Sequence, residues 1–153
     1  MEFDKNVTCA FTGHRILDDS FSKDFLKQNV ENLLDRGYRV FLVGMALGFD
    51  TECFHVLEEL RRKISLKIIA CIPCSEQPDT FGKTQKDEYF RMLKESDEQI
   101  LVSPSYYNGC MQKRNRFMVD NSTVVVAFVR KNRGGAYSTV KYAEKQRKEI
   151  IKI

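Results

Sequence analysis

The chain has 153 residues, of which 42% are hydrophobic and 30% charged, with a formal net charge of +4. This length and balance fit one folded domain over residues 1–153 and exclude a disordered chain. The first residues lack the pattern of a signal peptide, and no apolar run approaches the roughly 20 residues that span a bilayer. Five cysteines, an odd number, fit reduced thiols. We therefore expect a cytoplasmic protein with no membrane partner.

Short apolar runs alternate with helical patterns along the chain. In chain order, we expect a strand over 7–12, a helix through 21–34 capped at 18–20 and ended by Gly37, a strand over 38–43, a helix after 50–51 and a strand over 66–72. There follow a short helix over 87–95, a strand over 99–102, a helix through 114–120, a strand over 123–129, a helix near 138–147 and a strand over 149–153. Continuous apolar strands between helices are typical of parallel sheets covered on both faces. We predict a doubly wound α/β fold with a mostly parallel sheet and helices on both faces, and leave the strand order open.

Glycines mark the loops that follow the predicted strands. In a parallel sheet, these loops gather at the carboxyl edge and form a crevice for ligands. Glycine lets backbone N–H groups approach a phosphate, and a helix that begins just after it adds the positive end of its dipole. Such glycines are Gly13, Gly44, Gly48, Gly134 and Gly135. Each alone is compatible with a plain turn, but several at one edge favour a binding site.

The stretch from Gly134 to Thr139 fits a phosphate site best, because it lies between a strong strand and a helix. Gly134 and Gly135 would hold the phosphate, and Ser138 or Thr139 would add a hydroxyl donor. The alternative is a turn with a helix cap.

The loop after the second strand matches neither of two common nucleotide motifs. Gly44 and Gly48 are not followed by Gly-Lys-Ser/Thr, and they do not form Gly-x-Gly-x-x-Gly. Walker-type ATP hydrolysis and ordinary NAD binding are therefore disfavoured. Asp50 has two interpretations, an N-cap of the next helix or a contact with the ligand.

Charged residues lie at the mouth of the predicted crevice. His14 would exchange protons or donate a hydrogen bond, and Arg15 would clamp a phosphate. Arg114 and Asn115 enter a helix that reaches the same space. Asp120 lies near the end of that helix, where a carboxylate opposes the dipole, so we expect a partner such as an arginine.

Metal and cofactor chemistry find little support in the sequence. Cys71 and Cys74 have the spacing of a metal or redox motif, but they stand alone, and a zinc site needs about four ligands. We expect no metal and no cofactor. The mild positive charge suits an anionic ligand without requiring one.

Four motifs follow one another at a distinctive spacing: Thr12-Gly13-His14-Arg15, Gly44-x-x-x-Gly48-x-Asp50, Arg114-Asn115-x-x-Met118-Val119-Asp120, and Gly134-Gly135-x-x-x-Thr139-x-x-x-Ala143. Together they resemble the SMF/DprA–LOG (SLOG) superfamily, specifically its YpsA-like branch of small bacterial and phage-associated proteins, over nearly the whole chain. The resemblance implies a Rossmann-like fold, a site for a nucleotide or a nucleotide-derived molecule, and assembly into homo-oligomers. Among the relatives, LOG enzymes cleave the N-glycosidic bond of nucleoside monophosphates, DprA-like members bind single-stranded DNA, and other SLOG domains are thought to sense nucleotide signals.

The chain departs from the LOG enzymes at their catalytic motif, Pro-Gly-Gly-x-Gly-Thr-x-x-Glu. Here Arg133 replaces the proline, the third glycine is absent, and Lys141 replaces the glutamate. Because the oxocarbenium-like transition state needs a nearby carboxylate, only Asp50 and Asp120 remain as catalytic candidates. We therefore expect binding or sensing of a nucleotide-like molecule. One alternative is a nucleoside 5′-monophosphate N-glycosidase.

A second alternative is the binding of single-stranded nucleic acid. This function needs a basic groove with aromatic side chains on which bases stack. Tyr106, Tyr107, Lys113 and Arg114 provide a limited version of such a groove.

Overall fold

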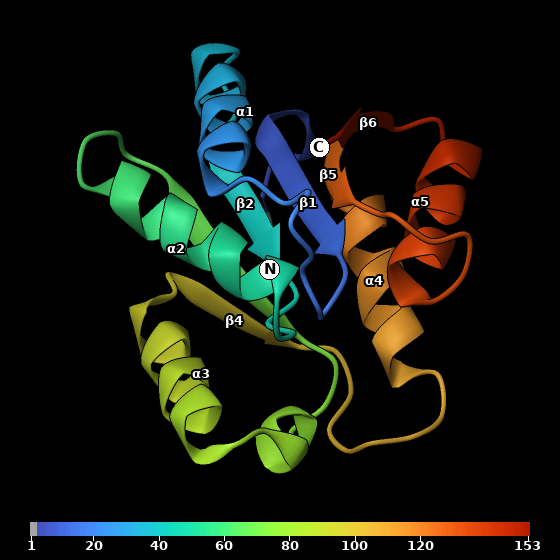
Figure 1. The fold of residues 1–153 in the computed structure, drawn as a ribbon. Helices are drawn as coiled ribbons and strands as arrows, with labels where there is room; N and C mark the ends of the chain where they lie inside the picture. The colour runs from blue at the N-terminus through green and yellow to red at the C-terminus, as the bar shows by residue number, and fades with distance from the viewer. Residues whose placement is uncertain (1–2) are drawn as a thin grey trace.

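The computed structural model describes residues 3–153, in which six parallel strands form one sheet (Figure 1). The strands are β1 (Thr8–Gly13), β2 (Val40–Val43), β3 (Lys67–Ile72), β4 (Glu98–Leu101), β5 (Val124–Phe128) and β6 (Glu149–Lys152). Their order is β4-β3-β2-β1-β5-β6. The chain therefore builds the sheet outward from β1 to β4, then crosses back to place β5 on the free side of β1. The order reverses between β1 and β5, which is where sheets of this type bind ligands.

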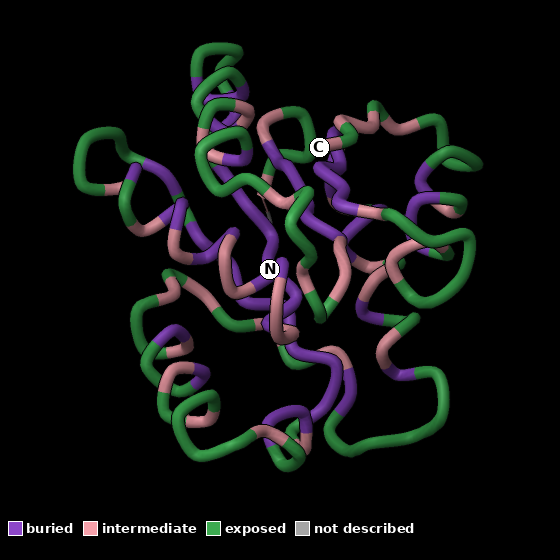
Figure 2. The backbone as a smooth tube through the Cα atoms, in the orientation of Figure 1, coloured by how far each residue is buried: buried purple, intermediate pink, exposed green. Residues whose placement is uncertain are grey.

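Helices cover both faces of the sheet, as the sequence predicts. The helices are α1 (Lys23–Asp35), α2 (Phe49–Arg61), α3 (Lys83–Glu95), α4 (Cys110–Asp120) and α5 (Gly135–Lys145), with short 3-10 turns η1 (Lys5–Val7) and η2 (Gln77–Thr80). Side chains of α1, α2 and α3 pack in one core cluster, and those of α4 and α5 pack in the other. Along β2, Phe41 and Val43 join the first cluster, whereas Val40 and Leu42 join the second. This alternation explains why the central strands are buried throughout (Figure 2).

Every helix begins at a different residue from the one predicted: α2, α4 and α5 start at Phe49, Cys110 and Gly135, before the predicted positions, and α1 and α3 also differ. Helix α1 is capped by Ser22, whose hydroxyl accepts a hydrogen bond from the backbone of Phe25 at 3.1 Å. Asp18 instead closes a turn by accepting bonds from Ser20. Helix α3 begins before residue 87, because the side chain of Gln85 accepts a bond from the N–H of Gly82 and so satisfies the first turn. No helix within residues 3–153 has both the length and the apolar character needed to cross a bilayer.

Aromatic packing covers the carboxyl end of β1. The ring of Phe49, at the start of α2, stacks on Phe128 and meets Phe11 and Phe21 edge-on. A Cβ atom on Gly13 would overlap the Phe49 ring. Glycine at this position is therefore required by the packing of the core.

Replacing Gly13 tests this requirement. We expect Gly13→Ala to lower the free energy of unfolding by about 1–3 kcal/mol, because the added methyl group displaces Phe49 from a well-packed cluster. Gly135→Ala is the matched control, since nothing lies within 4 Å of the position of its Cβ. Urea denaturation followed by circular dichroism measures both variants, and equal stabilities would contradict the packing role of Gly13.

Candidate functional site

A cleft of about 340 Å³ opens at the carboxyl edge of the sheet, beside the point where the strand order reverses. Its walls come from the end of β1 and the loop after it, the β2–α2 loop, the first turns of α4 and the start of α5. The lining residues are Phe11, Thr12, Gly13, His14, Arg15, Gly44, Ala46, Asp50, Met111, Arg114, Asn115, Gly135 and Ala136. Four loops that are far apart in the sequence thus meet at one cavity.

Three helices begin with glycine beside this cleft. The N-cap residues of α2, α4 and α5 are Gly48, Gly109 and Gly134, with φ of 78°, 107° and 94°, and none has a side chain to cap the helix. The N–H groups of Phe49 and Cys110, at the starts of α2 and α4, donate to carbonyl oxygens of preceding loops. The first turn of α5 therefore offers the N–H groups and the dipole end that favour an anion. Side chains at Gly134 and Gly135 would meet open space, since no atom beyond the adjacent residues and the helix backbone lies within 4 Å of a Cβ built there.

Asp50 is the carboxylate on the cleft wall. It is 7% exposed, and its Oδ2 accepts a hydrogen bond from the backbone N–H of Ala46 at 3.1 Å. Burial raises the pKa of Asp50 to about 6, although the positive charges of Arg114 and Arg15 act in the opposite direction. Asp50 therefore does not serve as the N-cap of α2, which is one of its two predicted roles, because Gly48 holds that position.

Arg114 forms the floor of the cleft and is only 5% exposed. Its guanidinium donates hydrogen bonds to the carbonyl oxygens of Gly44 and, at 3.2 Å, of Cys71, so α4 is tied to the ends of β2 and β3. Its Nε donates to the side chain of Asn115 at 2.8 Å. A Cβ on Gly44 would lie 2.9 Å from the guanidinium carbon of Arg114 and 3.0 Å from Asp50. Gly44 is thus needed for close approach within the protein.

His14 and Gly48 hold the loops around the cleft. The backbone N–H of Arg130 donates to Nε2 of His14 at 2.7 Å, which joins the loops after β1 and β5. Burial, together with the positive charges of Lys131 and Arg130, lowers the pKa of His14 and favours its neutral form. A Cβ on Gly48 would overlap the carbonyl of Arg15, so Gly48 permits the β2–α2 loop to pack on the β1–α1 loop. Arg15 itself is exposed at the cleft wall.

The other predicted site residues lie outside the cleft lining. Thr139 donates its hydroxyl to the carbonyl of Gly135 at 2.7 Å, and with Ser138 it borders a separate cavity of about 40 Å³. Asp120 lies at the opposite end of α4, where it accepts a hydrogen bond from the hydroxyl of Tyr142 at 2.7 Å. Asp120 thus has a partner, as expected, but this partner is a tyrosine and not an arginine.

Two residues that the sequence did not single out help to shape the cleft. The side chain of Gln77, in η2, donates to the carbonyl of Gly44 at 3.1 Å and accepts from the hydroxyl of Tyr89 at 3.0 Å. Tyr89, Gln77 and the carbonyl of Gly44 thus form a buried polar chain that ends at the floor of the cleft. No local pattern reveals this chain, because Gln77 and Tyr89 reach Gly44 only through the tertiary fold.

Comparisons with known proteins agree with this fold. The fold and the cleft define a Rossmann-like domain with a cleft at the carboxyl edge of its sheet. The profile described as the YspA SLOG family (YpsA) matches residues 18–153, and the chain belongs to this family. The chain is 33% identical over 140 residues to the uncharacterized SPbeta prophage-derived protein YoqJ of Bacillus subtilis strain 168, with 80% of each chain covered. It is 26% identical over 105 residues to a UPF0398 protein of Staphylococcus aureus strain Mu3, which covers 67% of this chain and 56% of that protein.

Two solved structures share the fold. DNA processing protein A (DprA) from Streptococcus pneumoniae aligns with a TM-score of 0.69 at 19% identity, over 97% of this chain and 50% of the other. DprA from Helicobacter pylori, described with its single-stranded DNA binding mode, aligns with a TM-score of 0.67 at 18% identity, over 97% and 65%. This chain thus spans half to two thirds of each DprA protein, and the likeness concerns the fold.

The raised pKa of Asp50 makes a prediction about stability and pH. Between its ordinary pKa of 3.8 and about 6, the folded state holds a proton that the unfolded state has lost, so stability falls as pH rises through this window. A pKa difference of this size corresponds to roughly 3 kcal/mol. Asparagine does not titrate. We therefore expect the free energy of unfolding of Asp50→Asn to rise relative to that of the wild type as the pH increases from 4 to 7. Urea denaturation across this range measures it, with the exposed Asp19→Asn as control. Parallel pH profiles for the wild type and Asp50→Asn would contradict the prediction.

Proposed function

We propose that the cleft binds a nucleotide or a nucleotide-derived small molecule, and that the protein acts as a binding or sensing domain. The observation that carries this proposal is the open space before α5. There, the uncapped first turn at Gly134 and Gly135 faces a cleft whose wall also carries Arg15. Free N–H groups, the helix dipole and a guanidinium together suit a phosphate group.

The contacts of the cleft residues indicate a different role for each of them in binding. Arg114 shapes the site, because its Nη1 and Nε already donate hydrogen bonds within the protein, and the charge of its guanidinium also favours an anion in the cleft. Arg15 takes the role of the neutralising charge. Asp50 lies on the β2 side of the cleft, where a carboxylate suits the hydroxyl groups of a sugar.

The N-glycosidase alternative rests on Asp50. Within residues 3–153, it is the single carboxylate that lines the cleft, whereas Asp120 lies at the far end of α4. Lys141, at the position of the LOG glutamate, is exposed and lies 3.5 Å from Glu144. A site with one carboxylate and no counterpart of the LOG glutamate favours binding over hydrolysis.

Ligand titrations test both functions. We expect at least one compound among the nucleoside monophosphates, NAD and ADP-ribose to raise the melting temperature and to bind in calorimetry. Gly135→Asp should weaken this binding by roughly tenfold or more, because its carboxylate repels a phosphate while it also stabilises the start of α5. Gly135→Ala is the matched control and should bind the phosphate more strongly than Gly135→Asp. Failure of all these compounds to bind the wild type would overturn the proposal, and release of free base by chromatography would establish the N-glycosidase.

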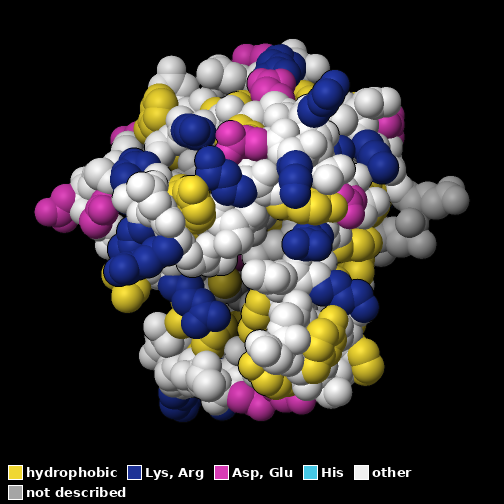
Figure 3. All heavy atoms as spheres, turned by 90° about the vertical axis from the view of Figure 1, so that its right-hand side faces the viewer, with side chains coloured by type: hydrophobic (Ala, Val, Ile, Leu, Met, Phe, Trp, Pro, Cys, Tyr) yellow, Lys and Arg dark blue, Asp and Glu magenta, His cyan; other side chains and the backbone are white. Residues whose placement is uncertain are grey.

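Single-stranded nucleic acid is a second candidate ligand, for which a hollow of about 490 Å³ on the surface of α4 is the supporting observation. Its walls include Tyr107, Lys113, Arg116 and Phe117, which combine positive charge with aromatic rings. Figure 3 shows Lys and Arg side chains spread over this side of the molecule, with hydrophobic groups between them. The DprA protein from Helicobacter pylori, which shares the fold, is described as binding single-stranded DNA. Arg114 is buried and takes no part in this surface.

Charge-neutralising variants separate this candidate from the nucleotide site. If the hollow binds single strands, Lys113→Gln with Arg116→Gln should weaken binding of a fluorescent oligothymidylate in anisotropy titrations and lower its salt dependence. Lys63 follows the end of α2 and Lys94 lies in α3, and both are exposed. The double variant Lys63→Gln with Lys94→Gln therefore controls for the loss of two charges. An equal loss of affinity in both double variants would indicate non-specific attraction and argue against the hollow.

A further inference from the structure

A second cavity, of about 210 Å³, lies between α2 and α3 on the other side of the β2–α2 loop. Its apolar walls come from Met45, Leu47, Phe81, Tyr89 and Met92. Protein interiors pack densely and contain few voids larger than a water molecule. An apolar cavity of about 150 Å³ engineered in another protein stays dry and binds benzene. The cavity between α2 and α3 therefore has room for one or two small rings.

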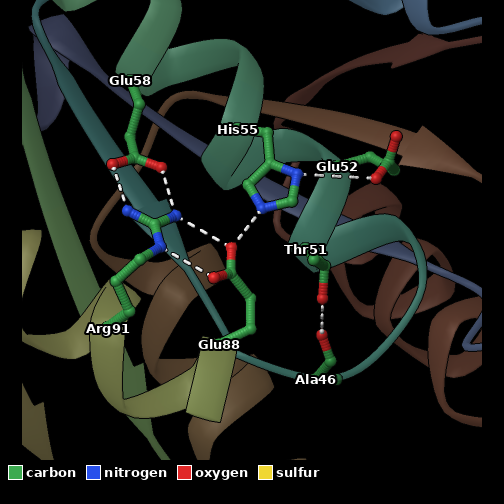
Figure 4. A network of polar contacts seen from close by, with 7 residues as sticks. All are labelled: Ala46, Thr51, Glu52, His55, Glu58, Glu88 and Arg91. Carbon is green, nitrogen blue, oxygen red and sulfur yellow. Dashed lines mark hydrogen bonds and ion pairs between the residues drawn. The ribbon is translucent and has the colours of Figure 1, made fainter. Parts of the chain in front are cut away.

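Polar groups on the wall are already bonded within the protein (Figure 4). The hydroxyl of Thr51 donates to the carbonyl of Ala46 at 3.3 Å. Nε of Arg91 lies 2.7 Å from one oxygen of Glu88, and Nε2 of His55 lies 2.6 Å from the other. The hydrogen bonds from Arg91 lower the pKa of Glu88 to about 2, so this carboxylate is ionised and paired. A ligand in the cavity finds no free partner in either Thr51 or Glu88.

Two further polar groups of the wall are also bonded within the protein. The hydroxyl of Tyr89 donates to Gln77, and the side chain of Gln85 accepts from the N–H of Gly82. Thr84 is exposed at the mouth. Because a buried charge or polar group without a partner costs several kcal/mol, the cavity selects against charged ligands.

The β2–α2 loop connects this cavity to the cleft. Met45 and Leu47 line the cavity, whereas Ala46 between them lines the cleft and donates its N–H to Asp50. Met45 has φ of 65°, a left-handed conformation that costs a residue with a side chain on the order of 1–3 kcal/mol, so the loop depends on its neighbours to hold it. The chain from Tyr89 through Gln77 to the carbonyl of Gly44 provides a second connection.

We propose that the cavity between α2 and α3 is a binding site for a small uncharged apolar molecule of one or two rings, and that its occupancy changes the floor of the cleft. The two methionines on its wall are flexible and polarizable, so they adapt to rings of different shape. Binding in the cavity does not depend on the nucleotide site. Its effect on ligand binding in the cleft, however, rests on the function proposed above.

Methionine methyl NMR on the intact protein tests the site with toluene as the probe and benzoate as its charged counterpart. Toluene should shift the methyl resonances of Met45 and Met92 in a saturable way, and benzoate at the same concentration should not. Met118 packs in the core cluster on the opposite face of the sheet and serves as the internal control. Absence of shifts at Met45 and Met92 up to the solubility of toluene overturns the site, and so does equal binding of benzoate.

Variants at the mouth and one further resonance complete the test. Thr84→Trp should block the cavity and abolish the toluene shifts, while Thr84→Ala should retain them; binding that survives Thr84→Trp overturns the location. Met111 lines the cleft, so it should also shift with toluene, and an unmoved Met111 overturns the coupling. Shifts that depend on protein concentration without toluene would instead show that a side chain of a second copy fills the cavity.

Discussion

The guanidinium of Arg114 lies inside the protein, where it donates to the carbonyl oxygens of Gly44 and Cys71 at the ends of two adjacent strands. Removing a charge from water costs several kcal/mol unless nearby groups replace the lost hydration. Here two carbonyls, the side chain of Asn115 and the neighbouring carboxylate of Asp50 supply that replacement. These demands fix the position of α4 on the sheet and the path of the β2–α2 loop, and they leave no room for a side chain at Gly44. Contacts within the protein therefore form the floor of the cleft.

The fold was predictable because burial on both faces leaves a clear trace in the sequence. Runs such as Val124–Phe128 are continuously apolar, and glycine at position 37 ends α1 with φ of 97°. The order of the strands was not predictable, since β1 pairs with β5 across more than a hundred residues and no local pattern encodes that partner. The start of α2 was ambiguous for a related reason. Asp50 has the chemistry of an N-cap, but its carboxylate is drawn instead to the N–H of Ala46 and the charge of Arg114.

The candidate site could be located from the sequence more easily than it could be interpreted. Glycines at the ends of strands predict the edge at which the loops meet, and the cleft opens at that edge. Their separate roles depend on three-dimensional contacts. A Cβ on Gly13 or Gly44 would collide with Phe49 or Arg114, whereas Gly134 and Gly135 face open space. Only contacts across the fold distinguish a glycine required for packing from one whose backbone is free to meet a ligand.

The charges around the cleft bear on what it can hold. Nη1 and Nε of Arg114 are bonded within the protein, although its charge still borders the cleft. His14 accepts a backbone N–H and favours its neutral form, so it provides no positive charge. Arg15 and the first turn of α5 remain to attract an anion. Asp50 lies on the same wall and, when it is ionised, repels a phosphate that comes close to it. An anionic ligand is therefore directed toward α5 and away from β2, which leaves the space beside Asp50 for an uncharged, hydroxyl-bearing part of the same molecule.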